Sequence, residues 1–79
     1  MPTHISLPPN QSISEFHTLF RQANDDDTPA DVLRLLSNHE SELIRGAVAL
    51  NPSTPIYVLD KLKQDSNEHV QSCIMKRKA

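Results

Sequence analysis

The sequence predicts an all-α fold of about five short helices, arranged as two and a half helix-pair repeats. The prediction depends on a 26-residue internal repeat, on recurring helix start and stop signals, and on a near absence of glycine. Thr28-Pro29 and Thr54-Pro55 are both typical helix starts, because threonine can cap free N–H groups and proline suits the first helical position. Asn51-Pro52 ends the preceding helix, since a residue before proline is pushed out of helical geometry. The same offset aligns further pairs: Val32 with Val58, Leu33 with Leu59, Leu36 with Leu62, Glu42 with Glu68, Ile44 with Val70, Ala47 with Cys73 and Val48 with Ile74.

Composition limits the class of protein. A chain of 79 residues with one glycine favours helices over antiparallel sheets with many tight turns. The net charge of −2 gives no general attraction to nucleic acid or acidic membranes. A single cysteine cannot form an internal disulfide, which suits a reducing cytoplasm. No apolar run approaches the roughly 20 residues of a membrane span, and the N-terminus lacks the pattern of a signal peptide. We therefore expect a cytoplasmic protein with no membrane segment.

The first part of the chain divides into an arm and a helix. Residues 1–11 contain three prolines and no apolar period, so we expect an extended arm before a single helical domain at 12–79. Ser12-x-x-Glu15 has the spacing of a capping box. It opens a predicted helix over 13–23, whose apolar stripe is formed by Ile13, Phe16, Leu19, Phe20 and Ala23.

Four shorter helices follow, and we expect them to form two nearly antiparallel pairs because the turns between them are short. Gly46 lies inside the third helix, where glycine costs up to about 1 kcal/mol relative to alanine, and so indicates a close crossing by another helix. Asp65 has the spacing of an N-cap for the last helix. The predicted ranges are 29–38, burying Val32, Leu33 and Leu36; 40–50, burying Leu43 or Ile44 with Ala47, Val48 and Leu50; 55–64, burying Val58, Leu59 and Leu62; and 65–76, burying Val70, Cys73 and Ile74.

Two acidic or metal-like patterns favour structural roles. Asp25 to Asp27 lack the alternating ligands and turn glycine of a calcium loop, and negative charge is favoured before a helix N-terminus. Asp65, His69 and Cys73 lie along one face of a helix, but buried cysteine usually behaves as a small hydrophobic residue. No phosphate loop, nucleophile elbow or paired-cysteine motif occurs. We therefore expect no enzymatic activity, no metal and no cofactor.

The motif Ala49-x-Asn51-Pro52-x-x-Pro55, followed by Leu59-x-x-Leu62-x-x-Asp65 and Val70, resembles the leucine-rich repeat variant family, which is similar in style to HEAT-like repeats. The resemblance covers about residues 23–71. This chain departs from the family pattern at Gln71, where arginine is common, and at His39, which holds the place of the acidic Asp65. The resemblance implies a short right-handed α-helical solenoid and no chemistry. Some members carry an iron–sulfur cluster on a separate cysteine-rich segment, but a single cysteine provides no ligand set for one.

These observations predict a non-catalytic protein-binding module or adaptor. Ile56 and Tyr57 replace Ala30 and Asp31 of the first pair, which indicates either packing on a neighbouring segment or a binding spot. In the second case Tyr57 is the anchor, while Asp60 and Lys61 supply a polar rim.

The partner is expected to be another protein or a second copy of the chain, because a solenoid of two and a half repeats leaves an end uncovered. The alternative is a nucleic-acid-associated module that uses the basic helix end, Lys76, Arg77 and Lys78. A solvated helix end matched to the helix dipole is the simpler explanation of that cluster, and nucleic acid is the less favoured partner.

Overall fold

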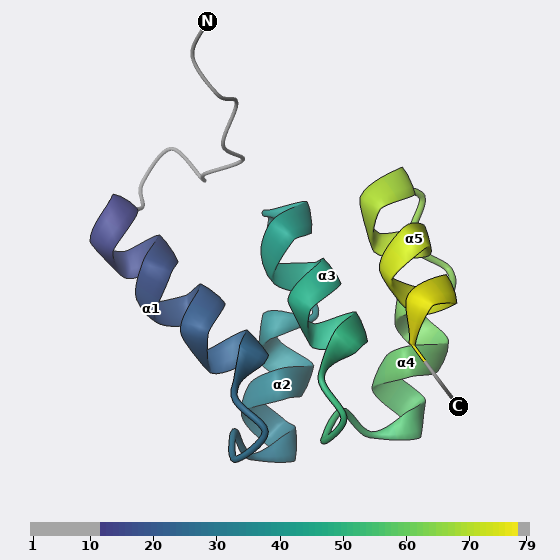
Figure 1. Cartoon of the computed structure of the whole chain (residues 1–79), viewed down its shortest axis with the longest axis horizontal. Coiled ribbons are helices and arrows are strands. Elements are labelled where there is room, and N and C mark those ends of the chain that lie inside the picture. Colours follow the sequence, from purple (N-terminus) through teal and green to yellow (C-terminus); the bar gives the residue numbers. More distant parts are fainter. Residues whose placement is uncertain (1–11, 78–79) are drawn as a thin grey trace, which may run out of the picture.

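The computed structural model describes residues 12–77, and within that range the chain forms five α-helices and no strand (Figure 1). The all-α prediction is confirmed. The predicted arm at 1–11 lies outside the described residues, as does Lys78. No described helix is long and apolar enough to cross a membrane. The helices are α1 (Ile13–Asn24), α2 (Ala30–Leu36), α3 (Glu42–Leu50), α4 (Ile56–Leu62) and α5 (Glu68–Lys76).

Helix α3 lies at the centre of the fold and packs against every other helix. Figure 1 shows α1, α3 and α5 side by side in one layer, with α2 and α4 behind them. The first helix begins with the predicted capping box: Ser12 Oγ accepts from the Glu15 amide at 3.1 Å, and Glu15 Oε1 accepts from the Ser12 amide at 2.9 Å.

The helix bounds follow the 26-residue offset of the sequence. Helix α4 begins and ends 26 residues after α2, and α5 begins and ends 26 residues after α3. The turn before each second-layer helix also matches, since Thr28 Oγ1 donates to Gln22 O at 2.6 Å and Thr54 Oγ1 donates to Val48 O at 2.7 Å. The predicted N-cap role of these threonines is wrong. Pro29 and Pro55 occupy the N-cap positions, and each threonine hydroxyl instead binds a carbonyl in the last turn of the previous helix.

The caps of α3 and α5 correspond in the same way. Ser41 Oγ accepts from the Leu43 amide, and Asn67 Oδ1 accepts from the His69 and Val70 amides. The N-cap of α5 is therefore Asn67 and not the predicted Asp65. Asp65 precedes the cap and accepts from the Asn67 amide at 3.0 Å, as the ring nitrogen of His39 accepts from the Ser41 amide at 2.9 Å.

The core lies between the two layers and around α3. Most of the predicted inward residues are buried, including Leu33, Ile44, Val48, Val58, Leu62 and Val70. Two predictions are wrong: Ile13 is 58% exposed at the start of α1, and Leu50 is 44% exposed. Ala49, which the sequence analysis did not place in the core, is fully buried because α3 has neighbours on several sides.

Gly46 marks a close helix crossing, as predicted. A Cβ atom at this position would lie 2.7 Å from His69 Nε2 and 3.0 Å from Cys73 Sγ. Both of these side chains come from α5, so the missing side chain lets α3 and α5 pack closely.

Leu33 and Leu59, which the offset aligns, differ in burial and predict different costs of truncation. Leu33 is fully buried and Leu59 is only partly buried. We expect Leu33→Ala to lower the free energy of unfolding by about 2–5 kcal/mol, and Leu59→Ala to lower it by clearly less. Urea denaturation of both variants measures the difference. Equal losses would contradict the assigned burial.

Candidate protein-docking surface

An open groove of about 500 Å³ lies at the C-terminal end of the helix stack, between α4 and α5. We call it the end groove. It is partly apolar, with charged residues along its side. Its lining residues are Pro52, Thr54, Ile56, Leu59, Asp60, Lys63, Ile74 and Arg77.

The groove is open because two positions that are buried in the preceding helix pair have no neighbour here. Leu59 and Ile74 lie 26 residues after Leu33 and Val48, both of which are fully buried. In the last pair both residues are only partly buried and line the groove. A partner on this side would therefore remove apolar surface from water, which favours association.

Of the predicted binding residues, the structure brings Ile56 and Asp60 to the groove. Ile56 is 76% exposed, and Asp60 forms a 3.6 Å ion pair with Lys63 on the next turn of α4. Tyr57 does not line the groove, but it is 59% exposed on the same first turn of α4. Tyr57 is thus not a core residue.

Lys61 points back into the molecule. Its Nζ donates to Ser37 O at 3.2 Å and to Ser37 Oγ at 3.0 Å, and it also contacts Asn38 Oδ1. Burial lowers the pKa of Lys61, the carboxylate of Asp65 opposes that shift, and the charge of Arg45 adds to it. The ammonium therefore ties α4 to the C-terminal end of α2.

Arg77 also makes internal contacts. Its Nη1 donates to Ala49 O at 2.5 Å and to Asn51 O at 3.0 Å. Asn51, 26 residues earlier, makes the corresponding bonds: its Nδ2 donates to Ala23 O and to Asp25 O, both at 2.9 Å. The basic end of α5 thus presents Lys76 to solvent, while the guanidinium of Arg77 holds the turn after α3.

An ion pair joins α3 to the turn between α4 and α5. Arg45 Nε donates to Asp65 Oδ2 at 2.7 Å, and its Nη1 donates to His39 O and Glu40 O. Burial by itself would raise the pKa of Asp65. The Arg45 hydrogen bond, the Asn67 amide and the charges of Arg45 and Lys61 outweigh burial and hold that pKa below its usual range.

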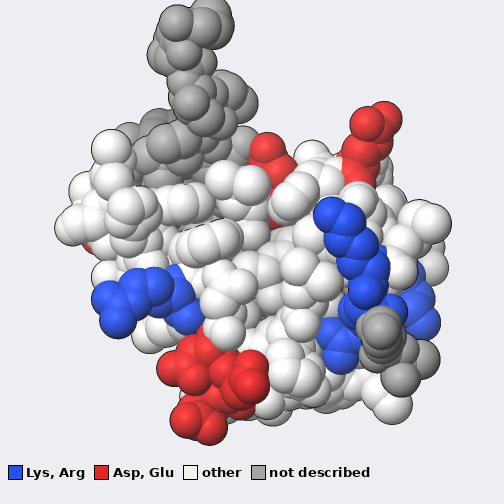
Figure 2. Space-filling view, viewed as in Figure 1, with Lys and Arg blue, Asp and Glu red and all other residues white. Residues whose placement is uncertain are grey.

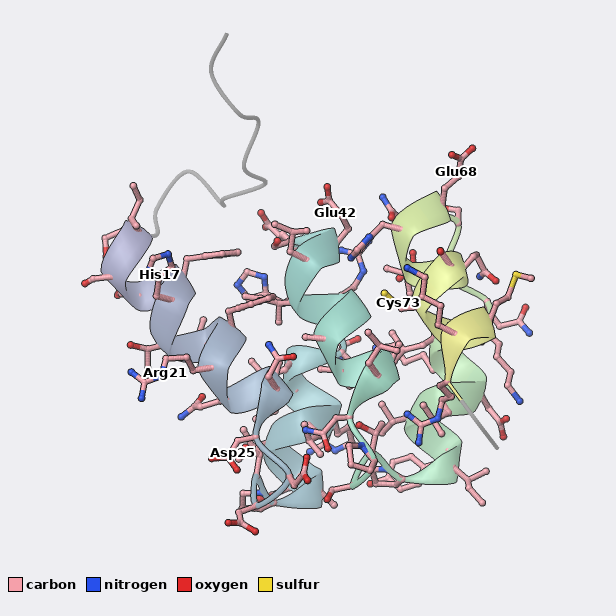
Figure 3. The ribbon with its side chains drawn as sticks, viewed as in Figure 1. His17, Arg21, Asp25, Glu42, Glu68 and Cys73 are labelled. Carbon is pink, nitrogen blue, oxygen red and sulfur yellow. The ribbon has the colours of Figure 1, made fainter. Side chains whose placement is uncertain are left out.

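A second, smaller groove of about 190 Å³ crosses the layer of α1, α3 and α5. Figure 3 shows Cys73 on the side of α5 that faces α3, and its Sγ lies 3.7 Å from His69 Nε2. Burial raises the pKa of the Cys73 thiol, and the charge of Lys76 only partly opposes it. The thiol is therefore protonated at neutral pH and is a weak nucleophile. The groove is lined by Phe20, Asn24, Leu43, Gly46, Ala47, Leu50, His69 and Cys73.

Charge is distributed around the edges of this layer. Figure 2 shows a broad uncharged area across its middle, with acidic side chains gathered over the turn between α1 and α2. Asp25 lies in that turn and is the C-cap of α1 (Figure 3), where its Oδ1 accepts from the Asp27 amide. Over residues 12–77, no group of three or more His, Cys, Asp or Glu side chains is placed to hold a metal ion. The predicted line of Asp65, His69 and Cys73 is divided, because Asp65 pairs with Arg45.

Sequence reasoning missed three residues of the end groove as site residues: Leu59, Lys63 and Ile74. The signal for Lys63 was present, because the 26-residue offset places it opposite Ser37, a change from a small polar side chain to a cation. Leu59 and Ile74 were predicted to be buried. Their partial exposure follows from their place in the last helix pair and not from their residue type.

Comparison of the chain with family models, with curated protein sequences and with solved structures gave no match.

The contacts of Arg77 predict that the two described basic residues at the end of α5 behave differently. We expect Arg77→Met to lower the free energy of unfolding by about 1–2 kcal/mol, because two backbone carbonyls lose a charged donor. Lys76→Met, the matched control, should change it by less than about 0.5 kcal/mol. Thermal or urea denaturation compares the two, and equal effects would contradict a structural role for Arg77.

The Arg45–Asp65 pair predicts a pH dependence of stability. Because the pKa of Asp65 is lowered in the folded protein, its contribution is complete above the unfolded pKa of about 4 and is lost as pH falls through the folded value. Asp65→Asn keeps an acceptor for the Asn67 amide but removes the charge. We expect it to cost about 1–2 kcal/mol at pH 7. The gap from the parent chain should shrink as pH falls below about 4, as followed by urea denaturation at each pH. A constant gap would exclude this ion pair as the source.

Proposed function

We propose that this chain is a non-catalytic protein-binding module or adaptor whose docking surface is the end groove together with the first turn of α4. The observation that carries the proposal is the partial exposure of Leu59 and Ile74 beside the exposed Ile56. Apolar side chains gathered on one face with a polar edge are typical of interaction sites. Tyr57 adds a rigid, amphipathic side chain of the kind enriched at interfaces.

As part of this proposal we assign the chain to the short right-handed helical solenoids that resemble leucine-rich repeat variants. The support comes from the equal offset of the helix bounds and of the side-chain bonds made by Thr28 and Thr54. Solenoids present extended surfaces built from repeated positions and act mainly by binding. The buried, protonated thiol of Cys73 also disfavours a nucleophilic activity.

The alternative, a nucleic-acid-associated module, depends on the basic end of α5. Arg77 is engaged with Ala49 O and Asn51 O, which leaves Lys76 as the exposed cation of the described part of this end. Phosphate binding normally uses several free cations and falls steeply with added salt. We therefore place protein binding first.

A capture experiment tests the proposal. The immobilised full chain is incubated with a nuclease-treated cell extract and compared with Ile56→Glu and with Met75→Glu. Met75 is 83% exposed on α5 and does not line the end groove, so it is the matched control. We expect Ile56→Glu to lose the proteins that the parent chain and Met75→Glu retain. Equal retention by all three would contradict docking at the end groove, and material lost on nuclease or salt treatment would favour nucleic acid.

Tyr57 provides a separate prediction. Because its side chain is 59% exposed, Tyr57→Ala should change the free energy of unfolding by less than about 1 kcal/mol. If it is an anchor, the same change should weaken partner binding by at least about 2 kcal/mol, roughly thirtyfold. Calorimetric titration with a captured protein, alongside urea denaturation, measures both. A stability loss with normal binding by the folded fraction would place the site elsewhere.

A further inference from the structure

We propose that the end groove is the interface of a two-fold symmetric homodimer, in which a second copy of the chain covers α4 and α5. This inference rests on the proposed function, because it names the partner of the same surface. The argument uses the interface that already exists inside the chain, where the α4–α5 pair covers α2 and α3.

The internal interface has two polar contacts that select its partner. Lys61 Nζ binds Ser37 at the end of α2, and Arg45 of α3 binds Asp65. Between them lie Leu33 and Val48, which the next helix pair buries completely. An in-line neighbour of α2–α3 therefore supplies a cation opposite Ser37 and a carboxylate opposite Arg45.

The end groove retains the apolar part of this pattern but not the polar part. Lys63 occupies the place of Ser37, so a further pair built like α4–α5 would bring its lysine against a like charge. Gln71 occupies the place of Arg45, and its amide already donates to Lys63 O and Asp65 O. The groove is thus unsuited to another in-line repeat of this kind.

A second copy stacked in line is also blocked by its own first helix. Such a copy would have to bring its α2–α3 pair onto α4–α5 of the first. Its α1 already packs on α3 and α2, and stays with them as the copy approaches. Head-to-tail contacts of this type also do not close, and they lead to open filaments.

A two-fold arrangement meets the chemistry of the groove. An isologous interface uses the same surface on both copies, so that surface must be self-complementary. The groove carries one acid and one base on adjacent turns of α4, Asp60 and Lys63, whose side chains are 64% and 58% exposed. Across a two-fold axis Asp60 of each copy faces Lys63 of the other, while Leu59 and Ile74 of both copies cover one another. The inference combines this charge complementarity with the apolar positions that the internal interface already buries.

Sedimentation equilibrium of the full chain tests the proposal. We expect the weight-average mass to rise from 8.9 kDa toward twice that value as the concentration approaches roughly millimolar, the range of a small interface. Ile56→Glu should weaken self-association at least tenfold and Met75→Glu should not. A strict monomer over the whole range would overturn the homodimer. If that monomer still retained other proteins through Ile56, the proposed module would stand without it.

Charge exchange distinguishes a two-fold contact from any other self-association. Asp60→Lys alone and Lys63→Asp alone should each weaken self-association at least tenfold, because like charges then meet across the axis. An equimolar mixture of these two single variants should associate again, since each variant now complements the other, and the double variant D60K/K63D should behave like the parent chain. Both positions are exposed, so the fold should not depend on them. Single variants that associate like the parent, or a mixture that stays monomeric, would overturn the two-fold contact.

Discussion

The arrangement of the helices depends on the side chain of Asn51, which lies 2% exposed between the turn after α1 and the turn after α3. Its amide nitrogen donates to Ala23 O and Asp25 O, and its oxygen accepts from the Ser53 amide at 2.8 Å. A buried amide is costly unless its donors and acceptor are satisfied. These three bonds can form together only when the two turns lie side by side, so they fix the placement of α3 against α1.

Arg77 repeats this arrangement one helix pair later with different chemistry. Its guanidinium reaches Ala49 O and Asn51 O, the counterparts of the two carbonyls that Asn51 binds. Thr28 and Thr54 support the same junctions by binding the last turns of α1 and α3. The 26-residue spacing is therefore carried by backbone carbonyls and by the donors that satisfy them, as well as by apolar positions. This accounts for the different expected roles of Lys76 and Arg77 despite their shared charge.

The helix count, the capping box at Ser12 and the close crossing at Gly46 were predictable, because each depends on local propensity or on apolar spacing. The exact caps were not. Thr54 and Asp65 have the chemistry of N-caps, but long-range acceptors and donors, the Val48 carbonyl and the Arg45 guanidinium, compete for them in the folded chain. Of the candidate site, Ile56 and Asp60 were identified from the repeat. Leu59 and Ile74 were not, since their exposure depends on what lies beyond the last helix pair.

The differences between the two helix pairs show why that last surface matters. A helix pair that only ended the stack would be expected to become polar on its outer side, as terminal repeats do. Here Lys63 and Gln71 change the polar contacts, yet Leu59, Ile74 and Ile56 keep an apolar surface between them. In a chain of 79 residues with a thin core, such a surface contributes to stability only when something covers it. Association at the end groove would therefore add directly to the stability of the fold, which links the binding surface to the helices that form it.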